Sequence, residues 1–376
     1  MRRFLPLVLL LLALVSPAWA LDSRTALADY HHDIWSARDG APGEVTSMAQ
    51  SADGWLWLGS TVGLYRFDGV RFRRFEPLPG ETAPARPVTA LTALRDGDLL
   101  IGYHYGGLSR LHQGHLIHYP GTVDAQPVGA VLSATVDTGG VLWAATGSGL
   151  LRLEQGRWRN AGKALGLPPG RLSNLVLDQY GQLWMAAGDQ LLVLTPGAAR
   201  LRTVLRGYIT TNLGASPDGR LWLDTHARLV PVPPQHRGPD LPRPAWLAQA
   251  EGQESGLFDR DGNYWALGCP GLCRSDGVGR GPSVARASLA RPDSRLEPSP
   301  QAASLGANIL FEDRDGNLWV GSQSGVERWR HNRLAPARLQ GGERYFSLAR
   351  DGAGQVLTLT RPNGGLWRLA RDGRSP

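Results

Sequence analysis

The chain has 376 residues, of which 42% are hydrophobic, and it contains 48 glycines and 27 prolines; its formal net charge is +7. This hydrophobic share fills a sizeable core and excludes an intrinsically disordered chain, and so many glycines and prolines are typical of an all-β protein with many turns. Lys163 is the only lysine, so nearly all of the positive charge is arginine. The arginines form no basic run or stripe, and the sequence therefore predicts no nucleic-acid partner.

Residues 1–20 have the pattern of a secretory signal peptide. Arg2 and Arg3 precede an apolar run from Leu5 to Val15, and an Ala-Trp-Ala cleavage site follows at residues 18–20. The run is shorter than the ~20 apolar residues of a membrane-spanning helix. We expect the mature chain, residues 21–376, to be periplasmic or secreted by a cleaved signal peptide, with no membrane span after it. An uncleaved membrane anchor is the alternative.

One repeat unit organises the mature chain. Its first copy is DGWLWLGSTVGLYRFDG, residues 53–69, in which glycine turns separate short apolar runs of strand length. Eight copies recur at intervals of 38 to 54 residues, close to the period of four-stranded propeller blades. The anchor residue, three after the turn glycine, is in turn Trp57, Leu100, Trp143, Trp184, Trp222, Trp265, Trp319 and Leu357.

The predicted unit runs from an innermost strand through a two-residue Asp-Gly turn to a second, a third and an outer strand. In the first copy the innermost strand is Val45 to Gln50 and the outer strand is Arg71 to Phe75. The eighth copy stops after its third strand, Leu366 to Ala370, whereas Tyr30 to Ser36 is a spare strand at the N-terminus. Two stretches that break the period, Val230 to Pro244 and Ser275 to Gly306, are predicted as inserted loops.

These units predict an all-β fold with a single β-propeller built from eight repeat units. We expect the N-terminal strand to complete the eighth blade and close the ring, because closure removes an exposed sheet edge. A ring of seven blades, in which the eighth unit begins a second propeller, is the alternative.

Three stretches carry a resemblance to a known family: residues 53–69, residues 313–329 (DRDGNLWVGSQSGVERW) and residues 35–50 (WSARDGAPGEVTSMAQ). They closely resemble the two-component regulator propeller repeats in the periplasmic sensor regions of bacterial sensor histidine kinases and hybrid two-component systems. Members of that family usually continue into a second propeller, a β-sandwich domain, a membrane span and a kinase, none of which is found in these 376 residues. The resemblance implies a ligand-sensing or partner-binding module, truncated or split from its kinase, with a separate histidine kinase subunit as a candidate partner.

The sequence predicts no catalytic residue, no metal site and no cofactor. Its recurrent acidic residues occupy the hairpin turn of the repeat, one in a blade, rather than forming the converging pair of carboxylates that a glycosidase needs. They are Asp53, Asp96, Asp218, Asp261 and Asp315. The nearby histidines His112, His115 and His118 are interpreted as solvent-exposed, because a turn and strand alternation separate them. A secreted propeller enzyme acting on polysaccharide, a lyase or a glycosidase, is the alternative function.

Cys269 and Cys273 are the only cysteines, and they flank the turn between the second and third strands of the sixth unit. Because an oxidising compartment favours disulfides, we expect a structural disulfide between them, with two free thiols as the alternative.

The variable turns between second and third strands gather on one face of the predicted ring, and they provide the candidate ligand-binding residues. Two of these turns offer aromatic surface and hydrogen-bonding groups suited to a small polar ligand, with an oligosaccharide as the candidate. The residues are Tyr103, His104, Tyr105, Asp224, His226 and Arg228. Ordinary solvated loops are the alternative.

Overall fold

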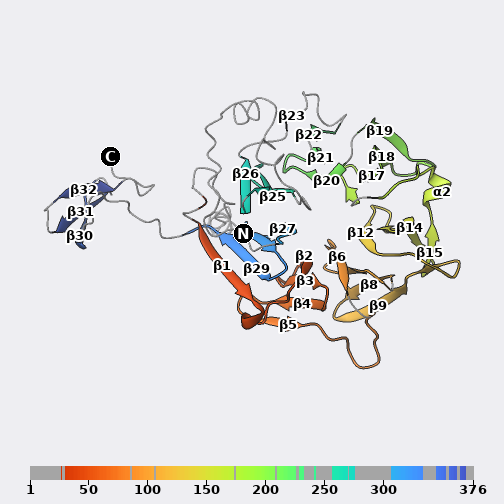
Figure 1. Cartoon of the computed structure of the whole chain (residues 1–376), viewed down its shortest axis with the longest axis horizontal. Helices are drawn as coiled ribbons and strands as arrows, with labels where there is room; N and C mark the ends of the chain where they lie inside the picture. Colours follow the sequence, from red (N-terminus) through yellow and green to blue (C-terminus); the bar gives the residue numbers. More distant parts are fainter. Residues whose placement is uncertain are drawn as a thin grey trace, which may run out of the picture.

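Antiparallel β strands make up almost all of the described structure, and Figure 1 shows their sheets arranged around a ring. The computed structural model describes residues 27, 30–84, 87–105, 107–172, 175–207, 210–225, 228–232, 241–242, 256–269, 271–275, 306–332, 344–352, 355–361 and 365–369. The predicted signal peptide lies outside these residues.

The first five sheets have four strands each, hydrogen-bonded in chain order, which confirms the meander predicted for the repeat. Blade 1 consists of β2 (Val45–Gln50), β3 (Leu56–Ser60), β4 (Gly63–Phe67) and β5 (Phe72–Arg74). Blade 2 consists of β6 (Val88–Ala93), β7 (Leu99–Tyr103), β8 (Gly107–His112) and β9 (His115–Pro120). Blade 3 consists of β12 (Val131–Val136), β13 (Leu142–Thr146), β14 (Gly149–Glu154) and β15 (Arg157–Asn160). Blade 4 consists of β16 (Val176–Leu177), β17 (Leu183–Ala187), β18 (Gln190–Leu194) and β19 (Arg202–Arg206). Blade 5 consists of β20 (Thr210–Ala215), β21 (Leu221–Thr225), β22 (Arg228–Pro231) and β23 (Leu241–Pro242).

Two further sheets continue the ring. Blade 6 consists of β24 (Gly256–Phe258), β25 (Tyr264–Cys269) and β26 (Gly271–Ser275). Blade 7 consists of β27 (Ile309–Glu312), β28 (Leu318–Gly321), β29 (Gly325–Arg330) and the N-terminal strand β1 (His31–Ser36). Shorter elements lie between the blade strands: η2 (Ala37–Asp39), β10 (Thr122–Val123), β11 (Gln126–Pro127) and α2 (Gly162–Leu165). Part of the first predicted inserted loop is therefore strand, at the end of β22 and in β23. Val232 is described as well and is buried, whereas residues 233–240 and 243–244 of that loop and residues 276–305 of the second lie outside the described residues.

The N-terminal strand closes the ring, but at the seventh unit. β1 pairs antiparallel with β29, from His31 opposite Arg330 to Ser36 opposite Gly325. Blade 7 then meets blade 1, where the backbone N–H of Glu44 donates to Gln323 O at 3.0 Å and that of Val45 donates to Ser322 O at 3.1 Å. The prediction that β1 completes the eighth blade is therefore wrong, because β1 belongs to the sheet of the seventh unit; among the described residues seven sheets make up the ring.

Charge explains why β1 pairs with the seventh unit. The Asp33 carboxylate accepts hydrogen bonds from Arg328 (2.7 and 3.0 Å) and from Arg330 (3.1 Å) on β29. On the other face of the two strands, His32 Nε2 lies 2.9 Å from the buried Glu327 Oε2, and the His32 ring stacks on Trp329. The spare strand is thus matched to β29 by the ion pairs of Asp33 and by the hydrogen bond and ring stacking of His32, which strand counting from the sequence did not weigh.

The eighth unit forms a sheet of its own, called the C-terminal sheet below. It consists of β30 (Arg344–Arg350), β31 (Val356–Arg361) and β32 (Leu366–Leu369). Within the described residues none of its strands pairs with a strand of the ring, and Figure 1 shows it apart from the ring.

Each anchor tryptophan of the ring is held by a residue six positions earlier. The indole N–H donates to a carboxylate of Asp137, Asp178, Asp259 or Asp313 at 2.7 to 2.8 Å, and in blades 1 and 5 to the hydroxyl of Ser51 or Ser216 at 2.9 Å. The other carboxylate oxygen accepts backbone N–H groups of the hairpin turn, as Asp137 Oδ1 does from Gly139 and Val141. One aspartate therefore fixes both the turn and the buried ring, because a buried N–H needs an acceptor.

The turn itself differs from the predicted two-residue hairpin. In blade 1 the backbone N–H of Ser51 donates to Trp55 O and that of Gly54 donates to Ser51 O, so the turn covers five residues. Gly54 has φ +97°, whereas Asp53 does not take a positive φ. The glycine is required for its left-handed backbone, and Asp53 instead accepts a hydrogen bond from the Ser51 hydroxyl.

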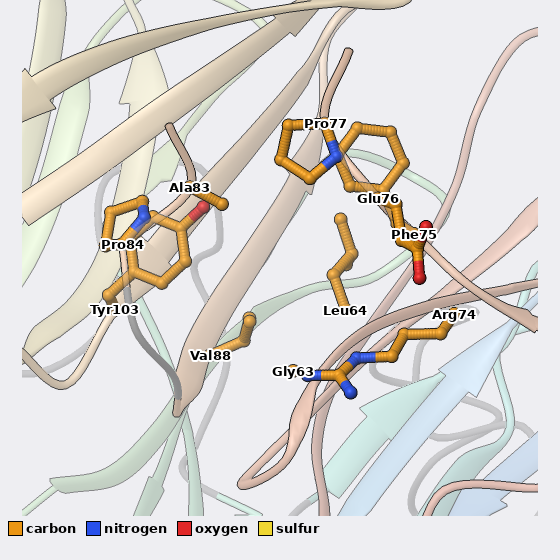
Figure 2. A pocket seen from close by; sticks show the side chains of 10 residues that line it. All are labelled: Gly63, Leu64, Arg74, Phe75, Glu76, Pro77, Ala83, Pro84, Val88 and Tyr103. Atoms are coloured by element: carbon orange, nitrogen blue, oxygen red, sulfur yellow. The ribbon is translucent and has the colours of Figure 1, made fainter. Parts of the chain in front are cut away.

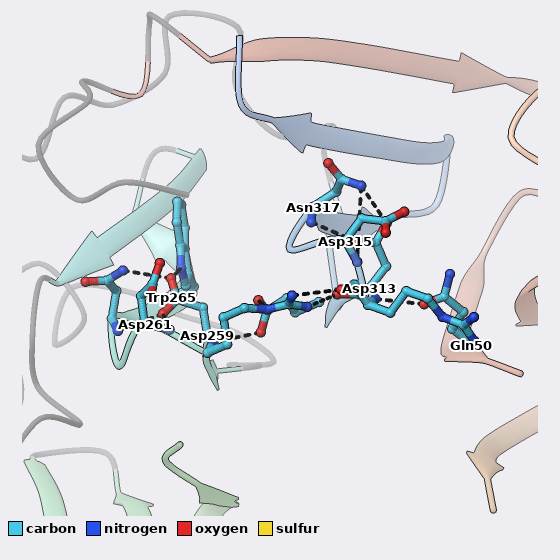
Figure 3. Close-up of polar contacts among 11 residues, drawn as sticks. Gln50, Asp259, Asp261, Trp265, Asp313, Asp315 and Asn317 are labelled. Atoms are coloured by element: carbon cyan, nitrogen blue, oxygen red, sulfur yellow. Dashed lines mark hydrogen bonds and ion pairs between the residues drawn. The ribbon is translucent and has the colours of Figure 1, made fainter. Parts of the chain in front are cut away.

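Arginines of the same turns connect neighbouring blades (Figure 3). Arg260 in blade 6 donates to the Glu312 carboxylate at 2.7 Å and to Arg314 O at 2.7 Å in blade 7. The backbone N–H of Arg314 donates to Gln50 Oε1 in blade 1 at 2.8 Å. Burial raises the pKa of Glu312 above its usual value, although the Arg260 charge acts in the opposite direction. These contacts join blades 6, 7 and 1 across the closure of the ring.

Candidate functional site

A cavity of about 490 Å³ lies between blades 1 and 2 (Figure 2), and it is the candidate functional site. Its volume falls in the range of small-molecule pockets. Figure 2 shows Tyr103 beside Pro84 on one side and Phe75, Glu76 and Pro77 on the other, with Leu64 and Val88 between them. The lining residues are Gly63, Leu64, Arg74, Phe75, Glu76, Pro77, Ala83, Pro84, Val88 and Tyr103.

The floor of the cavity is apolar. Leu64 on β4, Val88 on β6 and Tyr103 on β7 are all buried, because they belong to the packing layer between the first two blades. Phe75 follows β5 and its ring contacts Trp57 edge to face, with 5.7 Å between the ring centroids. A ligand on this floor would therefore contact aliphatic and aromatic carbon.

The loop from Glu76 to Pro84 roofs the cavity and is tied to blade 2 by Glu81. The carboxylate of Glu81 accepts the backbone N–H of Leu116 at 3.1 Å and lies 3.0 Å from His115 Nδ1. Burial alone would raise the pKa of Glu81, but these hydrogen bonds hold that pKa below its usual value. The charged form of Glu81 is thus the one that fastens the roof.

Two opposite charges line the cavity. Arg74 and Glu76 are both exposed, and Figure 2 shows the Arg74 guanidinium beside Gly63. Arg74 Nη2 donates to Val62 O at 3.2 Å, which holds the guanidinium beside the turn between β3 and β4. In the described structure neither side chain forms an ion pair.

A polar chain behind the floor positions Tyr103. Its hydroxyl is hydrogen-bonded to Ser109, and Ser109 Oγ lies 3.0 Å from His118 Nδ1. Burial raises the pKa of Tyr103 above its usual value, against the effect of the Ser109 hydrogen bond, and burial lowers the pKa of His118. At neutral pH the phenol is therefore protonated and the imidazole is uncharged. This arrangement holds the Tyr103 ring against the cavity.

The structure describes five of the six predicted ligand-binding residues, and they belong to two blades. Tyr103 lines the cavity, whereas His104 and Tyr105 are exposed beside each other and outside its lining. Asp224 is buried in blade 5, where its carboxylate accepts a 2.6 Å hydrogen bond from the Tyr264 hydroxyl. Arg228 begins β22 in the same blade, and His226 lies outside the described residues. The strands of blades 2 and 5 lie at different places around the ring (Figure 1).

Sequence reasoning missed Arg74 and Glu76. Arg74 ends β5 and Glu76 comes two residues later, just after the end of the predicted outer strand, and neither residue was predicted as a ligand contact. The connection from β5 to β6 is long enough to fold back over the blade interface, and that length is the signal that could have pointed to the cavity.

The three histidines of blade 2 differ in exposure and in their partners. His112 Nδ1 bonds Asp98 at 2.7 Å and His115 bonds Glu81, but His118 is half-buried rather than exposed. Among the described residues no group of three metal-ligating side chains occurs.

Cys273 is disulfide-bonded, and the side chain of Cys269 lies outside the described side chains. No described helix has the length and apolar character needed to cross a bilayer.

Comparison with known proteins identifies the repeat and the fold. Residues 305–324 match the Two component regulator propeller model. The extracellular domain of the putative hybrid two-component system BT3049 from B. thetaiotaomicron is 17% identical with a TM-score of 0.63, and the match covers 92% of this chain and 49% of that one. The corresponding domain of BT4673 from the same organism is 19% identical with a TM-score of 0.56, covering 91% and 46%. The chain therefore spans about half the length of these domains.

Other solved structures share the propeller fold. A streptogramin B lyase is 14% identical with a TM-score of 0.59, and the match covers 82% of this chain and 100% of the lyase. At these identities the likeness shows the fold alone. No curated protein matches the sequence.

Proposed function

Because the chain carries a two-component regulator propeller repeat, we propose that it is an exported ligand-sensing or partner-binding propeller of a two-component signalling system. Its role corresponds to the sensor region of a histidine kinase that lies on another chain or another part of a longer one. The observation that carries the proposal is the cavity between blades 1 and 2, which combines a buried apolar floor with two charged side chains. Such a combination is typical of small-molecule sites.

The location of the cavity fits a sensing role. Its walls come from two different blades, and its roof is fastened to blade 2 through Glu81. A ligand in the cavity contacts both blades at once, and it binds best when the blades and the roof are held in one arrangement. Ligand binding can therefore change the stability of this edge of the ring, which a kinase partner could detect.

A thermal-shift titration tests the proposal. Purified mature protein is expected to melt at a temperature that rises with ligand concentration, as binding to the folded state requires. Tyr103→Ala is expected to abolish the shift because it removes the aromatic wall. Tyr105→Ala is the matched control, since this exposed tyrosine lies outside the cavity. An equal loss in both variants would place ligand binding elsewhere.

An enzyme acting on polysaccharide is the alternative function. The residues that line the cavity include a single carboxylate, Glu76, whereas most glycosidases use two that flank the scissile bond. Incubation of the protein with polysaccharides and chromatography of the products tests this alternative. Products released from any polysaccharide would replace the sensing proposal with the enzyme.

Export is proposed on the signal-peptide pattern of residues 1–20 and is supported by the extracellular origin of the similar domains. N-terminal sequencing of protein from the periplasmic fraction is expected to begin near Leu21. An intact Met1 in the membrane fraction would contradict cleavage.

A further inference from the structure

We propose that the cavity between blades 1 and 2 binds a small zwitterion of the amino-acid class with an apolar side chain. This inference rests on the proposed ligand-binding function and adds the chemical class of the ligand. Its basis is the combination of one cation, one anion and an apolar floor in a single cavity.

Arg74 selects the carboxylate of the ligand. A guanidinium presents several N–H donors in a plane, a geometry that matches a carboxylate. One of these donors is already engaged with Val62 O at 3.2 Å, which orients the group while leaving other donors for a ligand. Since Arg74 forms no ion pair within the described residues, a bound carboxylate would meet no competing side chain there.

Glu76 selects the ammonium group. It lines the same cavity two residues after Arg74, and it likewise forms no ion pair in the described structure. A ligand with a carboxylate alone would bring a second negative charge towards Glu76, and a ligand with an amine alone would bring a second positive charge towards Arg74. A zwitterion complements both charges and avoids either repulsion.

The floor selects an apolar side chain. Leu64 and Val88 are buried, and with the ring of Tyr103 they offer no charged group to a ligand. An aliphatic or aromatic side chain buries apolar surface on this floor, at roughly 25 cal/mol for each Å² removed from water. The hydroxyls of a neutral oligosaccharide would instead lose water against aliphatic carbon and leave both charges unmatched.

The test compares amino acids with compounds that lack one or both of their charges. The melting temperature of the mature protein is measured with increasing L-leucine or L-phenylalanine, and in parallel with 3-phenylpropanoate, which lacks the ammonium, 2-phenylethylamine, which lacks the carboxylate, and maltose, which is neutral. The two amino acids are expected to raise the melting temperature in a concentration-dependent way, and the other three compounds are expected to have little effect.

Three variants locate the binding site by calorimetric titration with the same amino acids. Arg74→Gln and Glu76→Gln are each expected to weaken binding roughly 10- to 100-fold, the effect of losing a hydrogen bond to a charged group. Arg73→Gln is the matched control, because Arg73 is an exposed arginine on the same strand and does not line the cavity. It is expected to retain the affinity of the unmodified protein.

The outcomes separate the ligand class from the proposed function. Stabilisation by maltose but by neither amino acid, abolished by Tyr103→Ala, would overturn the zwitterion while the ligand-binding function stands. Amino-acid binding that Arg74→Gln leaves unchanged would overturn this cavity as the site. A melting temperature that no compound raises would count against both proposals.

Discussion

The ring and the C-terminal sheet are built from the same repeat, yet apolar side chains are buried in the ring and exposed in the C-terminal sheet. Trp319 and Trp57, anchors of blades 7 and 1, are 3% and 5% exposed. In the C-terminal sheet Leu348 and Leu366 are 71% and 70% exposed, and they lie on opposite faces of that sheet. A repeat of this kind therefore specifies a sheet, whereas the neighbouring sheets decide whether its apolar faces are buried.

The two regions differ in burial because both faces of a blade are apolar and each face needs a neighbouring sheet to cover it. In the ring each face packs against an adjacent blade, as the cluster of Met48, Leu58 and Trp319 does where blade 1 meets blade 7. In the part of the chain that the structure describes, no blade packs on the C-terminal sheet in this way. Its three strands are hydrogen-bonded like those of a blade, but hydrogen bonding alone does not remove the apolar faces from water.

The two regions should differ most when β1 is deleted from the ring or the whole C-terminal sheet is deleted from the chain. Removal of residues 31–36 takes β1 out of blade 7 and exposes the edge of β29 together with Trp329. We expect loss of the cooperative melt and aggregation, because an open edge invites pairing with other chains. Truncation after Asn332 removes the C-terminal sheet instead and is expected to leave the main transition unchanged. Melting curves and light scattering measure both. A monomeric β1 deletion with an unchanged melt would contradict closure by β1.

Side-chain truncation makes the same comparison at single residues. Trp319→Ala should lower the free energy of unfolding by about 3 to 5 kcal/mol, the usual cost of removing a large buried aromatic side chain. Leu366→Ala in the C-terminal sheet should change it by less than about 0.5 kcal/mol, as for other exposed positions. Chemical denaturation monitored by tryptophan fluorescence gives both values. Equal losses would mean that the two sheets are packed alike.

Within a single turn, Asp313 and Asp315 offer a finer comparison. Asp313 accepts the Trp319 indole N–H at 2.8 Å, whereas Asp315 is exposed. Asp313→Ala leaves that buried N–H without its acceptor and should cost about 1 to 3 kcal/mol. Asp315→Ala should cost much less. If denaturation midpoints showed the reverse order, the turn aspartate singled out by the sequence would be the important one after all.

The smallest expected effect is the pH dependence of the closure. Burial acts to raise the pKa of Asp33, but hydrogen bonds and charge from Arg328 and Arg330 hold that pKa below its usual value. A carboxyl whose pKa is lowered by folding stabilises the folded state above its unfolded pKa, and this stability is lost as the pH falls through the folded pKa. The difference in melting temperature between the protein and its Asp33→Asn variant should therefore be constant near neutral pH and shrink in acid. Asp351→Asn, in the C-terminal sheet, should leave the acid behaviour of the ring unchanged.

Only one of the residues that line the candidate site, Tyr103, was predicted from the sequence. Tyr103 was predicted as a ligand contact and does line the cavity, because a residue at the end of the second strand lies at the blade interface. Tyr105, only two residues later, is exposed, and Asp224 is buried by Tyr264 in another blade. Arg74 and Glu76 carry no motif: Arg74 reaches the cavity from β5 beside β4, and Glu76 reaches it as the first residue of the roof loop.

The sequence by itself determined the strands of the repeat, their order within a blade and the all-β propeller class, because turn glycines and apolar runs act locally and recur in every unit. Only the tertiary structure decided which unit β1 completes, since that depends on the match of Asp33 and His32 with charges on β29, about 295 residues away in the chain. It also decided the position of the cavity, because a cavity arises where two blades and a connecting loop fail to fill the space between them, and no local pattern records that.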